Sequence, residues 1–306
     1  MKTYYTITAL LLALSCTPKG RLLFYADVGA LNFPNDSWEP AAVAVAPDGT
    51  IYVADSSLNC AVQVFNAGGL YLGGIGGLGK GPGELFVPTD VAVAPKGNIY
   101  VAEFGTHRIS IFGPDGTFRK TVGESHLAGP LGVAVGRDDK IYVADAEAGG
   151  LLVFSPGGEL LETWGKERDT GRILDVAVAA DGSVAFAPSG TGDVAFFPGY
   201  GGGPVRLKGA EDPAFVATDV AFGPAGELFI LGRRPDEGGA VANFVKRLSS
   251  GGKLLEEVEI TLTLPTGLAV AADGTMYVTD GTRHDVRIYR PRPQNGRDVS
   301  SKKPAR

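Results

Sequence analysis

Three side chains of the kinds that bind Zn²⁺ stand at matched places in this sequence of 306 residues. Each lies five residues before the last residue of an expected β-strand, and the three are Cys60, His107 and His284. Thiolate sulfur and imidazole nitrogen are common ligands of Zn²⁺, so the set is a candidate metal site. The competing interpretation is that the spacing between the repeated units keeps these side chains too far apart for bonds to a single ion.

Seven acidic residues form two further sets. Four follow the second strand of a repeated unit: Asp55, Glu103, Asp145 and Asp280. Three begin the first strand of a unit: Asp90, Asp175 and Asp219. If both sets face one channel mouth, their negative potential would attract a basic ligand or a cation such as Ca²⁺ or Zn²⁺. The alternative is structural, because Asp commonly accepts hydrogen bonds from turn N–H groups; we favour it for the strand-end acids and leave both interpretations open for the other three.

No catalytic motif accompanies these candidates. The sequence contains no Gly-x-Ser-x-Gly, His-Glu-x-x-His or Cys-x-x-Cys pattern. Trp38 lies just before the first unit, where an aromatic ring with one polar atom would suit a binding face. The sequence therefore predicts a binding surface more readily than an active site.

The elements that position these residues are six copies of one phrase of fifteen residues. Typical copies read AAVAVAPDGTIYVAD and TDVAVAPKGNIYVAE, and they recur every 42 to 48 residues. The copies begin at Ala41, Thr89, Leu131, Leu174, Thr218 and Thr266. Short strands with Gly turns at such a period are typical of a β-propeller with one four-stranded blade per repeat. The sequence therefore predicts an all-β, six-bladed propeller over residues 21–290.

The last repeat lacks its fourth strand. After Tyr289 and Arg290 the chain continues as Pro291-Arg292-Pro293, which supplies few donors for a strand ladder. Residues 22–28 resemble the fourth strands of other repeats, so we expect this N-terminal strand to complete the sixth blade and close the ring. Residues 291–306 are polar and basic, and we expect a disordered tail there.

The N-terminal residues predict the cellular location of the protein. Lys2 precedes a short apolar run, and the segment Leu12-Ala13-Leu14-Ser15-Cys16 resembles a bacterial lipobox. That resemblance implies a signal peptide over residues 1–15, lipidation of Cys16, a linker over residues 16–20 and a membrane-tethered, extracytoplasmic protein in the periplasm or at the cell surface. The alternative is an ordinary cleaved signal in which the cysteine is incidental.

Composition narrows the class of partner. Apolar residues make up 44% of the chain and charged residues 20%, as in a packed globular protein. The formal net charge of -6 does not favour nucleic acid or an anionic membrane surface as a partner, so membrane contact is expected only through the lipid.

The phrase GPGELFVP, followed by DVAVAPKGNIYVAE and THRISIF, resembles an NHL-repeat β-propeller of the bacterial lipoprotein type. In copies 4 and 5 Pro188 and Gly232 replace the usual acid. The resemblance implies a recognition platform, and His followed by Arg, as at His107, is part of its consensus. A few relatives are enzymes, among them peptidylglycine amidating lyase, which takes metal-binding histidines from this region.

These observations predict a recognition or scaffold propeller that binds a protein, peptide or small ligand of the cell envelope at its channel mouth. The alternative is a metal-dependent lyase or hydrolase that uses His107, His284 or the first-strand aspartates. The two hypotheses differ in whether the purified protein holds a metal ion that its activity requires.

Overall fold

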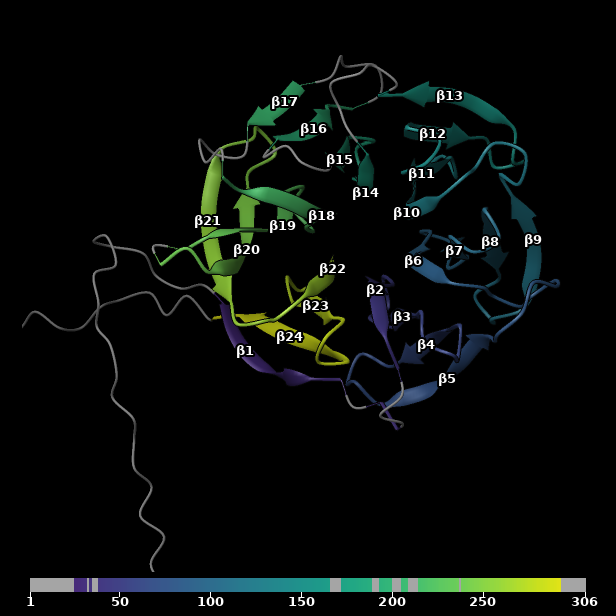
Figure 1. Ribbon diagram of the computed structural model, residues 1–306, viewed down its shortest axis with the longest axis horizontal. Helices are drawn as coiled ribbons and strands as arrows, with labels where there is room; N and C mark the ends of the chain where they lie inside the picture. The colour runs from purple at the N-terminus through teal and green to yellow at the C-terminus, as the bar shows by residue number, and fades with distance from the viewer. Residues whose placement is uncertain are drawn as a thin grey trace, which may run out of the picture.

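The computed structural model describes residues 25–31, 33–34, 38–165, 172–188, 193–199, 205–208, 214–236 and 238–292. They form six antiparallel sheets of four strands each, which stand as blades around a central opening (Figure 1). Among these residues there is no α-helix, and therefore none that is long and apolar enough to cross a membrane. The predicted six-bladed propeller is confirmed.

Each blade places its strands in chain order from the channel outward, except at the closure of the ring. The innermost strands are β2 (Pro40–Val45), β6 (Pro88–Val93), β10 (Pro130–Val135), β14 (Ile173–Val178), β18 (Val216–Phe222) and β22 (Pro265–Val270). The second strands are β3 (Ile51–Asp55), β7 (Ile99–Glu103), β11 (Ile141–Asp145), β15 (Val184–Pro188), β19 (Leu228–Pro235) and β23 (Met276–Asp280). The third strands are β4 (Ala61–Phe65), β8 (Arg108–Phe112), β12 (Gly150–Phe154), β16 (Asp193–Phe197), β20 (Val241–Leu248) and β24 (Asp285–Pro291). The outer strands are β5 (Tyr71–Gly76), β9 (Phe118–Val122), β13 (Leu160–Trp164), β17 (Val205–Lys208), β21 (Leu254–Ile260) and β1 (Tyr25–Ala30).

The ring is closed by the N-terminal strand, as the sequence predicted. β1 pairs antiparallel with β24 and becomes the outer strand of the sixth blade (Figure 1). The structure describes this strand over Tyr25–Ala30, and residues 22–24 of the predicted strand lie outside the described part of the chain. An ion pair between Asp27 and Arg287 joins the two strands. Closure pairs the edge that the last repeat would otherwise leave open.

The core lies between blades. Each of the six apolar clusters is built from residues of two neighbouring blades, so every blade is packed on both faces. Second strands such as β3 and β7 are buried along their whole length for this reason. A ring packed in this way holds its inner strands rigidly around the channel.

One irregularity recurs in all six blades. Near the start of the first strand the pairing with the second strand skips one residue, which is a β-bulge. The skipped residues are Ala41, Thr89, Leu131, Leu174, Thr218 and Thr266. A bulge redirects the side chain of the extra residue, and here it does so at equivalent points around one channel mouth.

Blade five departs from the others. β19 and β20 are eight residues long, whereas the second and third strands of blades one to three have five. In blade five Gly232 stands where those blades end their second strand with an acid, and the strand continues through Arg233 to Pro235. The β19–β20 hairpin therefore extends beyond the mouth face of the other blades.

Candidate functional site

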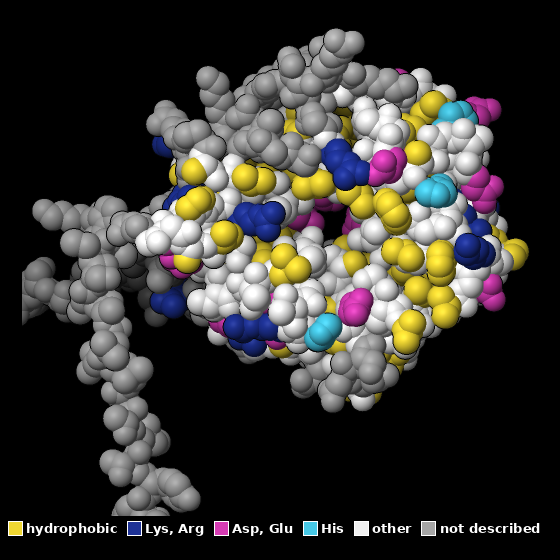
Figure 2. Space-filling model, in the orientation of Figure 1, with side chains coloured by type: hydrophobic (Ala, Val, Ile, Leu, Met, Phe, Trp, Pro, Cys, Tyr) yellow, Lys and Arg dark blue, Asp and Glu magenta, His cyan; other side chains and the backbone are white. Residues whose placement is uncertain are grey.

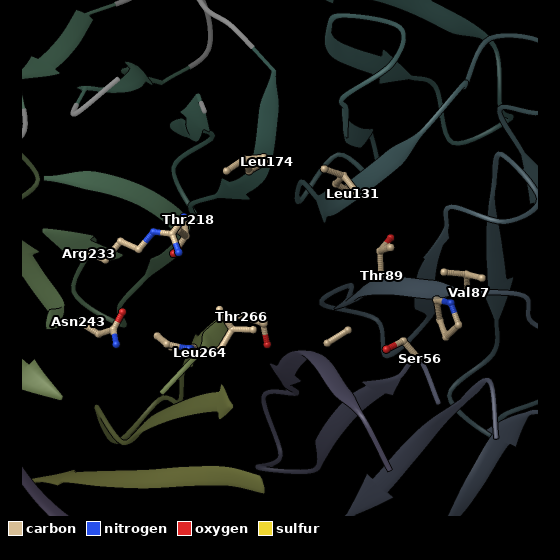
Figure 3. A pocket seen from close by; sticks show the side chains of 13 residues that line it. Ser56, Val87, Thr89, Leu131, Leu174, Thr218, Arg233, Asn243, Leu264 and Thr266 are labelled. Carbon is tan, nitrogen blue, oxygen red and sulfur yellow. The ribbon is translucent and has the colours of Figure 1, made fainter. Parts of the chain in front are cut away.

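A pocket of about 460 Å³ occupies the channel mouth. All six bulged residues line it, so every blade contributes to one cavity (Figure 3). The remaining lining residues come from the surrounding loops and from blade five: Ser56, Val87, Pro88, Arg233, Asn243, Leu264 and Pro265. Of the thirteen lining side chains seven are apolar and six are polar, and among the polar ones that of Arg233 is charged. A cavity that combines apolar walls with a small number of polar groups is the usual form of a ligand site.

The hydroxyl groups of the pocket are already used by the fold. Thr89 donates to the carbonyl oxygen of Pro130 in the next blade, and Thr266 donates to that of Pro40. Thr218 donates to the carbonyl oxygen of Leu231, and Ser56 to that of Glu39. None of them contacts a described histidine or carboxylate that would activate it as a nucleophile.

One residue deeper along the six first strands lies a ring of small and acidic side chains. Its members are Ala42, Asp90, Gly132, Asp175, Asp219 and Gly267. Successive residues of a strand are about 3.3 Å apart, so this ring lies directly below the bulged residues. Figure 2 shows acidic side chains inside the central opening. The structure therefore brings together the three first-strand aspartates that the sequence singled out.

These aspartates tie neighbouring blades together. Asp90 accepts the backbone N–H of Val133 in the next blade, at 2.6 Å, and Asp175 accepts that of Val220 at 3.0 Å. Gly132 is needed beside Asp175, because a Cβ at that position would lie 2.7 Å from its Oδ1. Each of these aspartates thus has a structural role in the ring.

Their ionisation is nevertheless disfavoured. Burial raises the pKa of Asp175 to about 7. Burial, together with the charge of Asp175, raises the pKa of Asp90 and of Asp219 well above the ordinary value. Asp219 is 8% exposed, and its Oδ1 is buried with no hydrogen-bond partner among the described residues. A carboxyl group in such surroundings favours its neutral form.

The four strand-end acids lie on the same face but are not available to a ligand. Asp55, Glu103, Asp145 and Asp280 are all fully buried. Asp145 accepts the backbone N–H groups of four loop residues, and Asp280 does the same. Glu103 accepts from Phe86 N–H, Thr106, Arg108 and Ser110. These contacts correspond to the structural interpretation of the acids.

Hydrogen bonds reverse the effect of burial at two of these acids. Burial raises the pKa of Asp280, but the N–H groups of residues 263, 264, 282 and 283 together lower it below the ordinary value. At Asp55 burial is likewise outweighed, by donors that include Glu39 N–H and the Gln63 amide, and the pKa is lowered. Both groups are therefore carboxylates at neutral pH, fixed by loop donors.

The Zn²⁺ set is not assembled. Cys60, His107 and His284 share a left-handed backbone conformation, with φ of 41°, 55° and 55°, at the turn before the third strand. Gly149 has the same conformation at the equivalent turn of blade three, with φ of 73°. Among the described residues, no group of three or more His, Cys, Asp or Glu side chains is placed to hold a metal ion. Cys60 is buried and donates to the carbonyl oxygen of Ser57, so the shared feature of the set is a turn.

Two other predicted residues lie outside the pocket. Trp38 is 3% exposed; its ring stacks on Phe33 and its Nε1 donates to the carbonyl oxygen of His284. It belongs to the core between blades six and one and does not line the mouth. Cys16, with the signal peptide, the linker and most of the C-terminal tail, lies outside the described residues.

Sequence reasoning missed the bulged residues and Arg233. The bulged residues head the repeats, but nothing in their types, which are Ala, Thr and Leu, marks a pocket. A signal for Arg233 did exist, because Gly232 breaks the acidic consensus immediately before it. The break marks the point at which blade five continues its strand instead of turning.

Comparison with protein families matches the NHL repeat at residues 38–65 and 87–112, the first three strands of blades one and two. The protein is a six-bladed β-propeller that contains NHL repeats. No curated protein matches its sequence.

Several solved structures share the fold of this NHL-repeat propeller. One is a catalytically inactive histidine-to-alanine variant of virginiamycin B lyase from Staphylococcus aureus with quinupristin, with 14% identity, TM-score 0.61, and coverage of 87% of this chain and 99% of that one. Another is Kuenenia stuttgartiensis hydrazine synthase, with 18% identity, TM-score 0.62, and coverage of 83% and 77%. A third is the WD40 β-propeller domain of Doa1, with 14% identity, TM-score 0.63, and coverage of 89% and 99%. At such identities the likeness concerns the fold alone.

Proposed function

We propose that this NHL-repeat propeller is a recognition module that holds a ligand, or an exposed segment of a partner protein, in the channel-mouth pocket. The observation that carries the proposal is the lining of that pocket. One bulged residue from each blade forms the wall, the apolar side chains are accessible, and His, Cys, Asp and Glu are absent from the described lining. Such a cavity can bind, and its described lining supplies no general acid or base.

We further propose that the propeller acts at the cell envelope. The lipobox-like segment ending at Cys16 supports this, since acylation at one cysteine would tether the whole ring to a membrane. Replacing Cys16 by Ser in the full chain would move the protein from the membrane to the soluble fraction. Retention of the Cys16→Ser protein on the membrane would contradict the tether.

Site-specific photo-crosslinking tests the binding surface. Leu264 lines the pocket and is 46% exposed, whereas Leu161 lies on the outer strand β13 and is 45% exposed. With a benzophenone amino acid at either position of the full chain, we expect adducts in envelope preparations from position 264 and not from position 161. Equal adduct patterns from the two positions would contradict a ligand site at the mouth.

The alternative, a metal-dependent lyase or hydrolase, has its own test. Elemental analysis of the full chain purified without chelator should find no stoichiometric Zn²⁺ or Ca²⁺ if the recognition proposal holds. About one ion per chain that is lost on His107→Ala or Asp175→Ala would favour the metal-dependent enzyme.

A further inference from the structure

The extended hairpin of blade five makes the mouth pocket asymmetric. In blades one to three the second strand ends at an acid that is enclosed by loop N–H groups. In blade five Gly232 takes that place, and a Cβ there would lie 2.4 Å from the Phe215 ring. The strand therefore runs on, and Arg233 pairs across the hairpin with Asn243. Both residues line the pocket.

Arg233 and Arg234 are adjacent in the strand, and their side chains lie on opposite faces of the hairpin. Arg234 lies over the Phe244 ring, 4.2 Å from its centroid, and donates to Glu257 at 2.8 Å. Successive residues of a strand point to opposite faces, so Arg233 points the other way. Figure 3 shows its side chain extending over the mouth toward Thr218. Within the described part of the chain, the exposed Arg233 has no ion pair or hydrogen bond from its guanidinium group.

Among the described residues that line the pocket, this arginine is the one charged side chain, although the net charge of the chain is -6. The strand-end acids of the same face are buried and paired with loop donors. The aspartates below the pocket favour the neutral form, because burial raises their pKa values. The described loops around the pocket carry exposed charges of both signs: Lys80 and Arg283 are cationic, with Arg283 3.8 Å from Asp280, and Glu39 and Glu147 are anionic. Within the described lining itself, the charge is positive and belongs to Arg233.

We propose that the mouth pocket binds an apolar ligand that carries a carboxylate, with the carboxylate paired to the Arg233 guanidinium and the apolar body packed against Val87, Leu131 and Leu174. The inference rests on the recognition function proposed above and names the chemistry of its ligand. A planar guanidinium group matches a carboxylate with two parallel hydrogen bonds. A cationic ligand would meet Arg233 as a like charge, and a fully polar ligand would leave the apolar lining unmatched. The C-terminus of an apolar peptide and a free carboxylic acid both carry this chemistry.

The test measures binding of matched probes to the full chain by isothermal titration calorimetry. The probes are N-acetyl-leucyl-phenylalanine, its C-terminal amide, and 4-phenylbutyrate as a carboxylic acid without a peptide. The variants are Arg233→Gln, Arg283→Gln as a matched control on the same face, and Leu264→Trp, which narrows the pocket. Thermal melts verify that each variant is folded, and if Leu264→Trp is not, Thr266→Trp replaces it.

We expect the acid form to bind about tenfold more tightly than the amide, because a charge-assisted hydrogen bond is then made. Arg233→Gln should remove that difference, Arg283→Gln should keep it, and Leu264→Trp should weaken all binding. Tighter binding of the dipeptide than of phenylbutyrate would identify a peptide terminus as the source of the carboxylate, and the reverse order a free acid.

The failures of the two proposals differ. Acid and amide binding equally, with Leu264→Trp weakening both, would overturn the carboxylate inference and leave the recognition pocket in place. Binding that is unaffected by Leu264→Trp would overturn the recognition pocket as well. Binding of neither the acid nor the amide would overturn the carboxylate inference, and the crosslinking at position 264 would then decide the recognition function alone.

Discussion

Asp280 and Asp175 both have less than a tenth of their surface exposed, yet their pKa values shift in opposite directions. Asp280 lies among the loops of the mouth face and accepts four backbone N–H groups, and its pKa is lowered. Asp175 lies in the channel, where burial outweighs the N–H groups of Val220 and Val176, and its pKa is raised to about 7. Burial by itself therefore does not decide the charge of a carboxyl group; the number of donors that face it does.

The strand-end acids and the channel aspartates also differ in what they can present to a ligand. The strand-end acids are charged but enclosed, so they organise loops and present no charge to a ligand. The channel aspartates lie directly below the pocket, where burial raises their pKa values and disfavours the charged form. Arg233 is the one charged side chain of the described pocket lining.

The largest loss of stability should come from removing an enclosed acid. Asp280→Ala leaves four loop N–H groups without an acceptor, and we expect a loss of about 3 kcal/mol in the free energy of unfolding at pH 7. Because the pKa of Asp280 is lowered in the folded state, this contribution is present above pH 4 and is lost as the pH falls further. Urea unfolding at pH 7 and pH 3 measures it; an equal difference between wild type and variant at both pH values would contradict the assignment.

Removing the charge of the channel aspartate Asp175 should instead increase the free energy of unfolding above neutral pH. Asp175→Asn keeps an oxygen for the Val220 N–H but removes a charge that burial disfavours. Since the folded-state pKa is raised from 3.8 to about 7, wild-type stability from this group is complete below pH 4 and falls as the pH rises through 7. At pH 8 we expect the variant to be more stable by about 4 kcal/mol, because the shift spans about three pKa units and each unit corresponds to about 1.4 kcal/mol. Urea unfolding at both pH values checks this.

A measurement at pH 4 and a control variant test the prediction for Asp175→Asn. At pH 4 the Asp175→Asn protein and the wild type should unfold at nearly the same urea concentration. Asp280→Asn serves as the matched control, because it should be less stable than wild type at pH 8. Destabilisation by both substitutions at pH 8 would show that the channel aspartate is charged and satisfied like the loop aspartate.

The smallest effect should be a change in the pKa of Asp90 when the charge of Asp175 is removed. The charge of Asp175 helps to raise the pKa of Asp90, so Asp175→Asn should lower the Asp90 pKa while leaving it above the ordinary value, because burial remains. Carboxyl ¹³C chemical shifts across a pH titration follow Asp90 directly. An Asp90 titration that is identical in both proteins would mean that the two carboxyl groups do not interact.

Much of the architecture follows from local sequence. A repeated phrase with β-formers and Gly turns predicts the blades, and the missing fourth strand at Tyr289 predicts closure by residues near the N-terminus. The enclosed role of Asp145 is also accessible from sequence, since an acid at the end of a strand before a turn has a known local use. The histidines show the limit of this reasoning: their metal-like spacing reflects one turn repeated around a ring.

The sequence by itself determined six blades, their order, and the residues that begin each first strand, because these depend on period and side-chain alternation within a few neighbouring residues. Only the tertiary structure decided that Ala41, Leu131 and Thr218 share a cavity, because a bulge in each blade and the closure of the ring bring them together across some 180 residues. It also decided that burial raises the pKa of Asp175 to about 7 and that Arg233 lines the mouth pocket without an ion pair among the described residues. Burial and the count of facing donors are set by neighbouring blades, which no local pattern specifies.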